Sequence, residues 1–455
     1  MKKNGFAFLK EFLIIFYICD MILEVLETRR KALKINLDEK VYGTFAEIGA
    51  GQEVARNFFN AGAASGTIAK TMSAYDMTFS NEIYGSEESG RYVSKSRLEK
   101  MLDHEFQLLG DRLHGEKYQT RTFFSFADTV TTLNYNKSND PHGWLGIKFQ
   151  LTPSGEANEI IFHVRLLDSD ATLQQNVLGI LGVNLVYAAF NYHQDPQRMI
   201  ESLADNLNQG SVEIDLISVK GPTFETLDEV LVNLYLLQKG FSSAAVFLPK
   251  IGVKQAKDLM YKQHIMILRT RFNQKTKPDF ELFEHAITQY KAYMQIGEVE
   301  LISMAELTLN NMMEDVQSED GDLLTRVAKR ANEIMELGYA VIISNFNRHH
   351  KLAKYLAKCK PKSVGITTNI ANLKHIFLSE NYGENYTNEL LAYISDLFSG
   401  NVKLLTYPFR DIKNKTIVTT KNLEVSPEAK PLFDFLLLNK YILDIEDIEG
   451  QINPD

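Results

Sequence analysis

Several apolar segments in the first part of the chain have the composition of β-strands. The strand-like segments are enriched in β-branched and aromatic residues and are bounded by Gly, Asn, Asp or Pro. They cover residues 42–49, 120–136, 143–152 and 158–168. Residues 94–113 follow the helical period instead, with Ser94 as the expected N-cap. We therefore predict an α+β domain over residues 40–195, with some strands joined as hairpins, after a helical extension over residues 1–39.

The second half of the chain has a different pattern, in which short and nearly continuous apolar runs are separated by amphipathic helical stretches. The runs are VEIDLISV, AAVFLP, HIMILRT, VELISMAE, YAVIISN, SVGITT and VKLLTY. Such runs are typical of strands buried on both faces of a parallel sheet, because helices cover that sheet on either side. We therefore predict a mostly parallel, Rossmann-like sheet domain over residues 196–455, and an α/β fold for the whole chain.

The composition is that of a globular protein with two or three domains, since 45% of the 455 residues are hydrophobic and 24% are charged. The formal net charge of -9 comes from interspersed acidic and basic residues, so no basic stripe for nucleic acid is present. The two cysteines, Cys19 and Cys359, lie far apart, which fits a reducing cytoplasm and supports neither a disulfide framework nor a zinc site. No metal site is predicted.

The N-terminal segment partly imitates a secretory signal, because lysines precede an apolar stretch. However, Lys10 and Glu11 interrupt the apolar region, the uncharged run over residues 12–19 is short, and no small-x-small cleavage site follows. The run is also far below the roughly 20 residues that span a bilayer. We expect no membrane span, and we interpret the segment as a helix docked by its apolar side, or as a start codon upstream of Met21. A signal peptide is the less favoured alternative.

A glycine-containing turn, EIGAGQEVAR, lies where a predicted strand meets a predicted helix. Gly49 and Gly51 would let backbone N–H groups approach an anion, and the dipole of the following helix would favour its charge. The third glycine of the dinucleotide fingerprint is missing, because Val54 occupies its position. Two alternatives stay open: a turn that only redirects the chain, and a phosphate loop in which Gln52 and Arg56 also contact the ligand.

Further polar residues lie close to this turn in the sequence. Glu47 precedes it, and Asp76 follows it within thirty residues. Lys70 lies in SGTIAKT, which lacks the Gly-Lys-Thr sequence of a nucleoside-triphosphatase loop. We predict Glu47 and Asp76 as candidate acid–base residues and Lys70 as a candidate phosphate ligand.

The strand segment IIFHVRLLD supplies a second candidate site. Strand alternation directs His163 and Arg165 to one face and their apolar neighbours to the other. If that face lines a cleft, His163 could act as an acid or base and Arg165 could bind a phosphate or carboxylate. The alternative is a half-exposed strand with both polar residues in water.

A third candidate site follows the run YAVIISN, at the expected carboxyl end of a parallel strand, where open α/β sheets bind ligands. Asn345 and Arg348 lie here, and a basic segment opens the next predicted helix. Cations in a first helical turn oppose the helix dipole, so an anionic ligand or an acidic partner could require them. A basic surface patch is the alternative. No Gly-x-Ser-x-Gly nucleophile motif occurs in the chain.

Over residues 21–440 the chain resembles a family of poorly characterised bacterial proteins. The resemblance is carried by FAEIGAGQEVARNFF, SGTIAKTMSAYDMTFSNEIYG, GWLGIKFQ, HVRLLD, LGILGVNLVYAAF and YPFRD. Members carry labels such as nicotinate- or nicotinamide-nucleotide adenylyltransferase or TonB-dependent receptor. The chain lacks the H-x-G-H-type phosphate motif of the first class, and we expect neither the signal peptide nor the series of membrane strands of the second. The resemblance therefore implies no catalytic residue here.

Taken together, these patterns predict a cytoplasmic protein that binds a phosphorylated small metabolite or a nucleotide in a cleft between its two domains. Group transfer is the reaction class that fits anion binding, so the chain could be a nucleotide- or phosphometabolite-dependent transferase. The cofactor is unknown. The alternative is a noncatalytic structural protein that self-assembles into a homo-oligomer, because long apolar helices such as residues 171–190 could form subunit contacts.

Overall fold

The computed structural model describes residues 25–88, 90–270, 276–297, 301–309, 323–383, 385–411 and 416–445. The expected docked helix over the first 20 residues, with Cys19, lies outside this range. The chain divides into two compact units. Unit 1 comprises Met1–Glu213 and Val219–Glu225, and unit 2 comprises Ile214–Ser218 and Thr226–Asp455. Each unit has its own sheet and core, and the predicted α/β class is confirmed.

The first sheet has six strands in the order β2-β1-β3-β4-β5-β6, and unit 1 contains all of it except Ile214–Ser218 of β6, which belong to unit 2. Its strands are β1 (Val41–Ile48), β2 (Ile68–Ser73), β3 (Thr122–Thr131), β4 (His142–Phe149), β5 (Asn158–Leu166) and β6 (Val212–Lys220). The helices of unit 1 are α2 (Thr28–Asn36), α3 (Gln52–Ala61), α4 (Met77–Tyr84), α5 (Lys95–Arg112), α6 (Ala171–Asn191) and α7 (Pro196–Ser202). The strands β2, β1 and β3 are parallel, whereas β3, β4 and β5 form the antiparallel meander that the expected hairpins imply.

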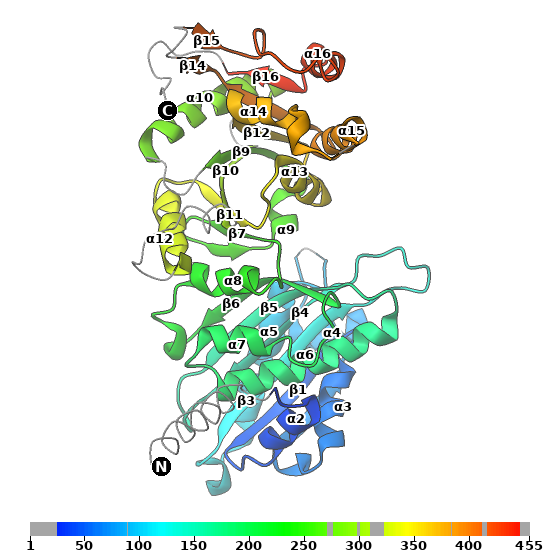
Figure 1. Ribbon diagram of the computed structural model, residues 1–455. Helices are drawn as coiled ribbons and strands as arrows, with labels where there is room; N and C mark the ends of the chain where they lie inside the picture. Colours follow the sequence, from blue (N-terminus) through cyan, green and yellow to red (C-terminus); the bar gives the residue numbers. More distant parts are fainter. Residues whose placement is uncertain are drawn as a thin grey trace, which may run out of the picture. The chain divides into compact units, whose positions relative to one another are not determined.

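Helices cover both faces of the unit 1 sheet (Figure 1). On one face Gly182 of α6 packs against Val54 of α3 and Phe126 of β3. On the other face Ser125 donates a hydrogen bond to the carbonyl of Leu102 in α5. Among the described helices, α6 is long and apolar enough to cross a membrane, but 72% of its most apolar window is buried inside the structure. Its apolar surface therefore forms core.

Unit 2 is built on an eight-stranded sheet of order β16-β13-β12-β9-β10-β11-β7-β8. The strands are β7 (Ala244–Leu248), β8 (Gly252–Lys254), β9 (His264–Thr270), β10 (Leu301–Thr308), β11 (Ala340–Ser344), β12 (Ser363–Asn369), β13 (Val402–Tyr407) and β16 (Ile442–Asp444), with β14 (Phe409–Asp411) and β15 (Thr416–Val418) in a separate hairpin. The helices are α8 (Glu229–Gln238), α9 (Ala256–Met260), α10 (Thr276–Met294), α12 (Leu323–Glu336), α13 (His349–Lys358), α14 (Ile370–Ile376), α15 (Tyr386–Leu397) and α16 (Lys430–Leu438).

The order β11-β10-β9-β12-β13-β16 is that of a doubly wound α/β fold, in which the chain winds outward from a central strand in both directions. All five pairings within it are parallel, as predicted. Two of the predicted strands of this domain behave differently. The run VEIDLISV forms β6 of the first sheet, and AAVFLP forms β7, which is antiparallel to β11. An antiparallel strand at the edge of a parallel sheet is common, and apolar runs do not specify strand direction.

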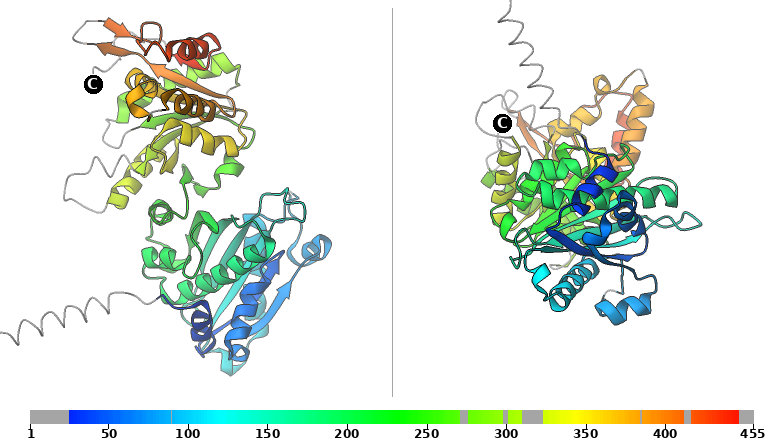
Figure 2. Two further views of the ribbon diagram at one scale, coloured as in Figure 1. Left: turned by 45° about the vertical axis from the view of Figure 1, so that its right-hand side comes forward. Right: turned by 90° about the horizontal axis from the view of Figure 1, so that it is seen from below.

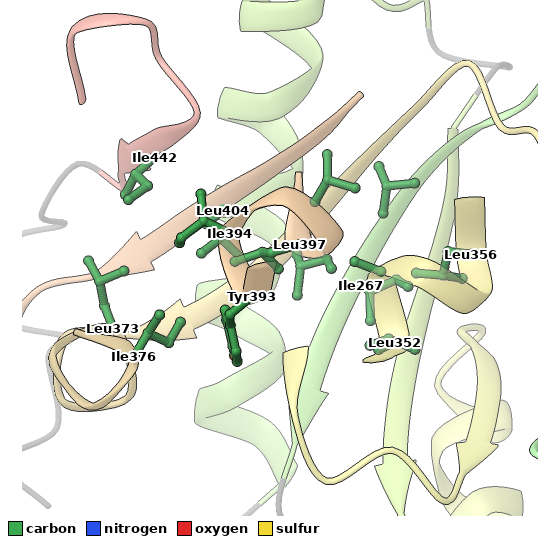
Figure 3. Close-up of a cluster of buried hydrophobic side chains, with 14 of the residues drawn as sticks. Ile267, Leu352, Leu356, Leu373, Ile376, Tyr393, Ile394, Leu397, Leu404 and Ile442 are labelled. Atoms are coloured by element: carbon green, nitrogen blue, oxygen red, sulfur yellow. The ribbon is translucent and has the colours of Figure 1, made fainter. Parts of the chain in front are cut away.

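Helices also cover both faces of the unit 2 sheet (Figure 2). Tyr290 of α10 packs over Gly365 of β12 on one face. The other face carries α13, α14 and α15, and Figure 3 shows Leu352, Tyr393 and Leu397 from these helices around Ile267 of β9. On this second face, polar residues follow the apolar core at the carboxyl ends of the strands.

Candidate functional site

Three polar residues from three parallel strands of unit 1 meet at the carboxyl end of the sheet. Glu47 of β1 is the register partner of Ser73 of β2 on one side and of Asp128 of β3 on the other. Because β1 leads to β2 on one side and β3 returns on the other, the strand order reverses at β1. Open α/β sheets bind ligands in the crevice at such a reversal.

The two carboxyl groups at this point are buried and poorly partnered. Glu47 is 2% exposed and Asp128 is fully buried. The Ser73 hydroxyl donates to Glu47 Oε2 over 2.8 Å, whereas Glu47 Oε1 and both Asp128 carboxyl oxygens have no hydrogen-bond partner among the described residues. Burial, and then the neighbouring Glu47 carboxylate, raise the pKa of Asp128 well above its usual value. Burial also raises the pKa of Glu47, and the hydrogen bond from Ser73 partly opposes this shift.

The backbone of the glycine turn passes close to β3, next to this pair of carboxyl groups. Gly49 has φ +94°, and a Cβ atom there would lie 2.0 Å from the Val130 carbonyl oxygen. Gly51 has φ -93°, a backbone conformation that other residues also adopt. A Cβ atom on Gly51 would instead lie 1.8 Å from Asp128 Oδ2. The site therefore needs Gly51 for space and Gly49 for both space and conformation.

The turn leads into the N-terminus of α3, which has no side-chain cap. Gly51 is the N-cap residue, and Gln52 donates its amide to the Gly49 carbonyl over 2.8 Å. The N–H groups of a first helical turn have no intrahelical acceptor and carry the positive end of the helix dipole. The arrangement can therefore combine anion binding on α3 with a carboxyl pair that holds a proton.

The other predicted residues near the turn have structural partners. Asp76 caps α4 by accepting from the Phe79 N–H over 2.8 Å. Arg56 is 67% exposed and pairs with Glu53 one turn earlier on α3. Lys70 pairs with the buried Glu105 of α5 over 2.8 Å. Since Lys70 is the register partner of Thr44, and residues alternate along β1, Lys70 lies on the opposite face of the sheet from Glu47.

His163 and Arg165 share one face of β5, as strand alternation predicts. Phe162 is aligned through Leu145 with Asp128, so His163 faces the opposite side of the sheet from the carboxyl pair. His163 is fully buried, and its Nε2 lies 3.0 Å from His142 Nδ1. Arg165 pairs with Glu213 over 3.1 Å and with Asp140 over 3.5 Å. This histidine and this arginine are therefore not brought together with Glu47.

Asn345 and Arg348 lie in unit 2, at the carboxyl end of β11. Asn345 donates its side-chain amide to the Leu237 carbonyl over 3.1 Å. Arg348 is exposed and is the N-cap residue of α13, without a side-chain capping bond.

Sequence reasoning missed Ser73 and Asp128. Asp128 lies within the apolar run FFSFADTV, and a carboxylate inside a strand that is otherwise suited to burial was the signal that could have identified it. Its pairing with Glu47 joins residues that are 81 positions apart, which no local pattern encodes. Within the described part of the chain, no group of three or more His, Cys, Asp and Glu side chains could hold a metal ion.

No protein-family model and no curated protein matches the chain. Among solved structures, it is similar to the competence/damage-inducible protein CihA from Agrobacterium tumefaciens, with 15% identity, a TM-score of 0.26, and coverage of 35% of this chain and 94% of that one. A CinA superfamily protein from Klebsiella pneumoniae gives 10% identity, a TM-score of 0.27, and coverage of 36% and 96%. One from Escherichia coli gives 12% identity, a TM-score of 0.25, and coverage of 35% of this chain and 92% of that one. Likenesses at this level assign no activity to the chain.

Proposed function

We propose that unit 1 is a small-molecule site of a cytosolic protein and that it binds a phosphorylated metabolite or a nucleotide at the carboxyl ends of β1, β2 and β3. The observation that carries the proposal is the Glu47–Asp128 pair, two buried carboxyl groups with unpartnered oxygens under an uncapped helix N-terminus. A buried polar atom without a partner costs roughly 1–3 kcal/mol, so a ligand group that pairs with it is favoured.

The phosphate part of the ligand is assigned to the N-terminus of α3. Backbone N–H groups and the helix dipole bind anions there, and Gly49 and Gly51 keep side chains out of the approach. The nearby carboxyl groups do not prevent this, because the raised pKa of Asp128 and Glu47 favours retention of a proton by the pair.

The carboxyl pair supplies acid–base chemistry for group transfer. A carboxyl group whose pKa is raised can donate a proton to a leaving oxygen, and its carboxylate partner can accept one from an attacking hydroxyl. Glu47 accepts a hydrogen bond from Ser73, and Asp128 lies against Gly51, where no side chain intervenes. We infer that these two carboxyl groups, rather than His163 or Asp76, carry any acid–base step.

Exposed aromatic residues next to the carboxyl end of β2 favour a nucleotide over a smaller phosphate ester. Tyr75 is 81% exposed and Phe79 is 58% exposed, and both follow Ser73 closely in the chain. The Ala74 N–H donates to the Glu47 carbonyl over 2.9 Å, which ties the start of this segment to β1. An aromatic face can stack on a nucleobase without hydrogen bonds, so this segment offers a surface for the base.

The test compares the parent protein with Asp128→Asn and with Asp103→Asn in a thermal-shift screen of nucleotides and phosphorylated metabolites. Asp103 is the control, because it is 61% exposed and pairs with Lys148 on the other face of the sheet. A ligand should raise the melting temperature of the parent and of Asp103→Asn, with binding to Asp128→Asn about tenfold to a hundredfold weaker. Equal affinity in all three proteins, or no ligand in the screen, would reject the proposal.

Self-assembly without catalysis remains the alternative prediction. The residues of α6 that suggested it are mostly buried inside unit 1, so contacts between copies would have to come from other surfaces. A measurement of mass in solution by light scattering tests this alternative directly.

A further inference from the structure

A row of polar residues crosses the unit 2 sheet at the carboxyl ends of its parallel strands. Thr406 of β13 is the register partner of Thr368 of β12, and Arg269 of β9 is the register partner of Glu306 of β10. The row lies on the face that α13, α14 and α15 cover, because the residue two positions earlier on each strand belongs to the apolar core there.

The strands β9 and β12 separate in the middle of this row. Their pairing ends at Ile267 and Ile366, although β9 continues to Thr270 and β12 to Asn369. These are also the strands between which the winding direction of the sheet reverses. The row therefore borders the crevice where doubly wound sheets bind their ligands.

Three buried polar side chains, on β12, on the neighbouring β13 and at the start of α13, have unpartnered atoms among the described residues. Thr368 Oγ1, Thr406 Oγ1 and His349 Nε2 have no hydrogen-bond partner among the described residues. Thr368 is 5% exposed, Thr406 is fully buried and His349 is 9% exposed. A threonine hydroxyl without a partner is costly in a core where valine has the same shape, so these atoms indicate that a polar group binds among them.

Arg269 and Glu306 belong to the same row, and both side chains have hydrogen-bond partners within the protein. Glu306 accepts from Arg269 Nε over 2.9 Å, and its other oxygen accepts from the hydroxyls of Thr308 and Ser344. Arg269 also donates to the Phe346 carbonyl, which ties the loop before α13 to the sheet. This pair is internally neutral, so the net charge of the surroundings comes from other residues.

The uncompensated charge near the start of α13 is positive. Arg348 and Lys351 lie in or just before its first turn, together with the positive end of the helix dipole. Burial, followed by the charge of Arg269, lowers the pKa of His349 to about 3, and burial and Arg348 lower the pKa of His350 to about 4. Both imidazoles are therefore neutral at pH 7.

We infer that unit 2 has a second ligand site, in which an oxyanion, a phosphate or carboxylate group of a small molecule, binds between the carboxyl ends of β9 and β12 and the N-terminus of α13. The hydroxyls of Thr368 and Thr406 donate hydrogen bonds to the anion, and so does Nε2 of His349. Arg348 supplies the opposing charge. Arg269 is a positioning residue, since its described bonds hold Glu306 and the Phe346 carbonyl. The inference does not depend on the function proposed for unit 1.

The test is calorimetric titration of the full chain with inorganic phosphate and, separately, with succinate, which distinguishes the two sources of an oxyanion. Thr368→Val should bind the anion about tenfold to a hundredfold more weakly, with an unchanged or higher melting temperature, because it removes a hydroxyl that has no partner in the free protein. Thr367→Val is the matched control. Thr367 Oγ1 faces away from the site and donates to the Ile267 carbonyl over 3.3 Å, so its loss should lower stability and leave affinity unchanged.

A second pair of variants tests the charge. Arg348→Ala should weaken binding, whereas Lys354→Ala should not, because Lys354 lies further along α13 and pairs with Asp396 over 3.1 Å. The inference is wrong if neither anion binds the folded parent, or if Thr368→Val and Arg348→Ala both keep the parent's affinity. Anion binding that only Asp128→Asn weakens belongs to unit 1 and would equally contradict a site in unit 2.

Discussion

The Asp128 carboxyl group is fully buried and has no hydrogen-bond donor among the residues that the structure describes, which makes its ionisation costly to the folded state. Its pKa is raised in the folded protein, so between the unfolded value of about 3.9 and the raised value the folded state retains a proton that the unfolded state has lost. The unfolded state then binds fewer protons, and stability must fall as the pH rises through this interval.

We therefore predict that the free energy of unfolding of the parent decreases from about pH 4 upward, and that Asp128→Asn shows a weaker decrease. Glu47 retains part of the dependence, because burial raises its pKa as well. Urea denaturation between pH 4 and pH 8 measures both curves. Parallel curves for the two proteins would show that Asp128 is ionised normally in the folded state.

The contact between Gly51 and Asp128 gives a second prediction at this scale. Gly51→Ala should destabilise unit 1 by about 1–3 kcal/mol, because the new methyl group would overlap Asp128 Oδ2. Gly66→Ala is the control, since no atom lies within 4 Å of a Cβ at that position. The double variant Gly51→Ala, Asp128→Ala should cost less than the sum of its single changes, as measured by denaturation. Additive costs would exclude the overlap as the cause.

Arg56 separates binding from folding at the same turn. Its guanidinium is mostly exposed and forms only a surface pair with Glu53, so Arg56→Ala should change stability by no more than about 0.5 kcal/mol. If Arg56 turns to a phosphate bound at α3, the same change should weaken binding by about one to two decades. Melting temperature and titration of the ligand from the screen provide the two readouts. Unchanged affinity in the folded variant would count against this loop as the anion site.

At the scale of elements, the position of α3 depends on its close packing against α6. A Cβ atom on Gly182 would lie 2.4 Å from Val54 Cγ2, and one on Gly179 would lie 2.7 Å from Glu53 Cβ. Small residues on α6 therefore allow α3 to approach, and this approach sets the direction in which the α3 N-terminus points. The apolar, buried character of α6 follows from its role as the helix that both α3 and β3 contact.

We predict that Gly182→Ala costs about 1–3 kcal/mol and also weakens ligand binding in unit 1, because it moves α3 away from the sheet. Gly110→Ala in α5 is the opposite case. No atom lies within 4 Å of a Cβ there, so the better helix propensity of alanine should stabilise the protein by up to about 1 kcal/mol. Denaturation curves measure both changes. A stabilising Gly182→Ala would contradict the close packing.

At the scale of the whole molecule, the chain has two cores and two separate candidate sites. Compact units with their own cores commonly unfold as separate cooperative transitions, and a ligand stabilises the unit to which it binds. We predict two calorimetric transitions. The ligand of unit 1 should raise the melting temperature of one transition in the parent but not in Asp128→Asn. The oxyanion of unit 2 should raise the melting temperature of the other transition in the parent but not in Thr368→Val. A single transition that both ligands raise equally would contradict independent units.

The sequence by itself determined the α/β class and the mostly parallel sheet of the second domain. Alternation of apolar residues and continuous apolar runs record which faces of a segment are buried, and the spacing of helices between the runs records parallel connections. The glycine turn at Gly49 could also be located, because a strand pattern ends and a helix pattern begins around it. The same reasoning identified Glu47 as a candidate and placed His163 and Arg165 on one face of their strand.

Only the tertiary structure decided which of these residues meet. Glu47 faces Asp128 because β3 returns to the free side of β1, and His163 lies on the opposite face because β4 and β5 align it with Thr129 rather than Asp128. The tertiary structure also decided the place of β6, which joins the first sheet although its apolar run resembles those of the second. Side-chain pattern along one segment records burial, whereas strand order and register arise from pairing between distant segments, and a shift of one residue reverses every face.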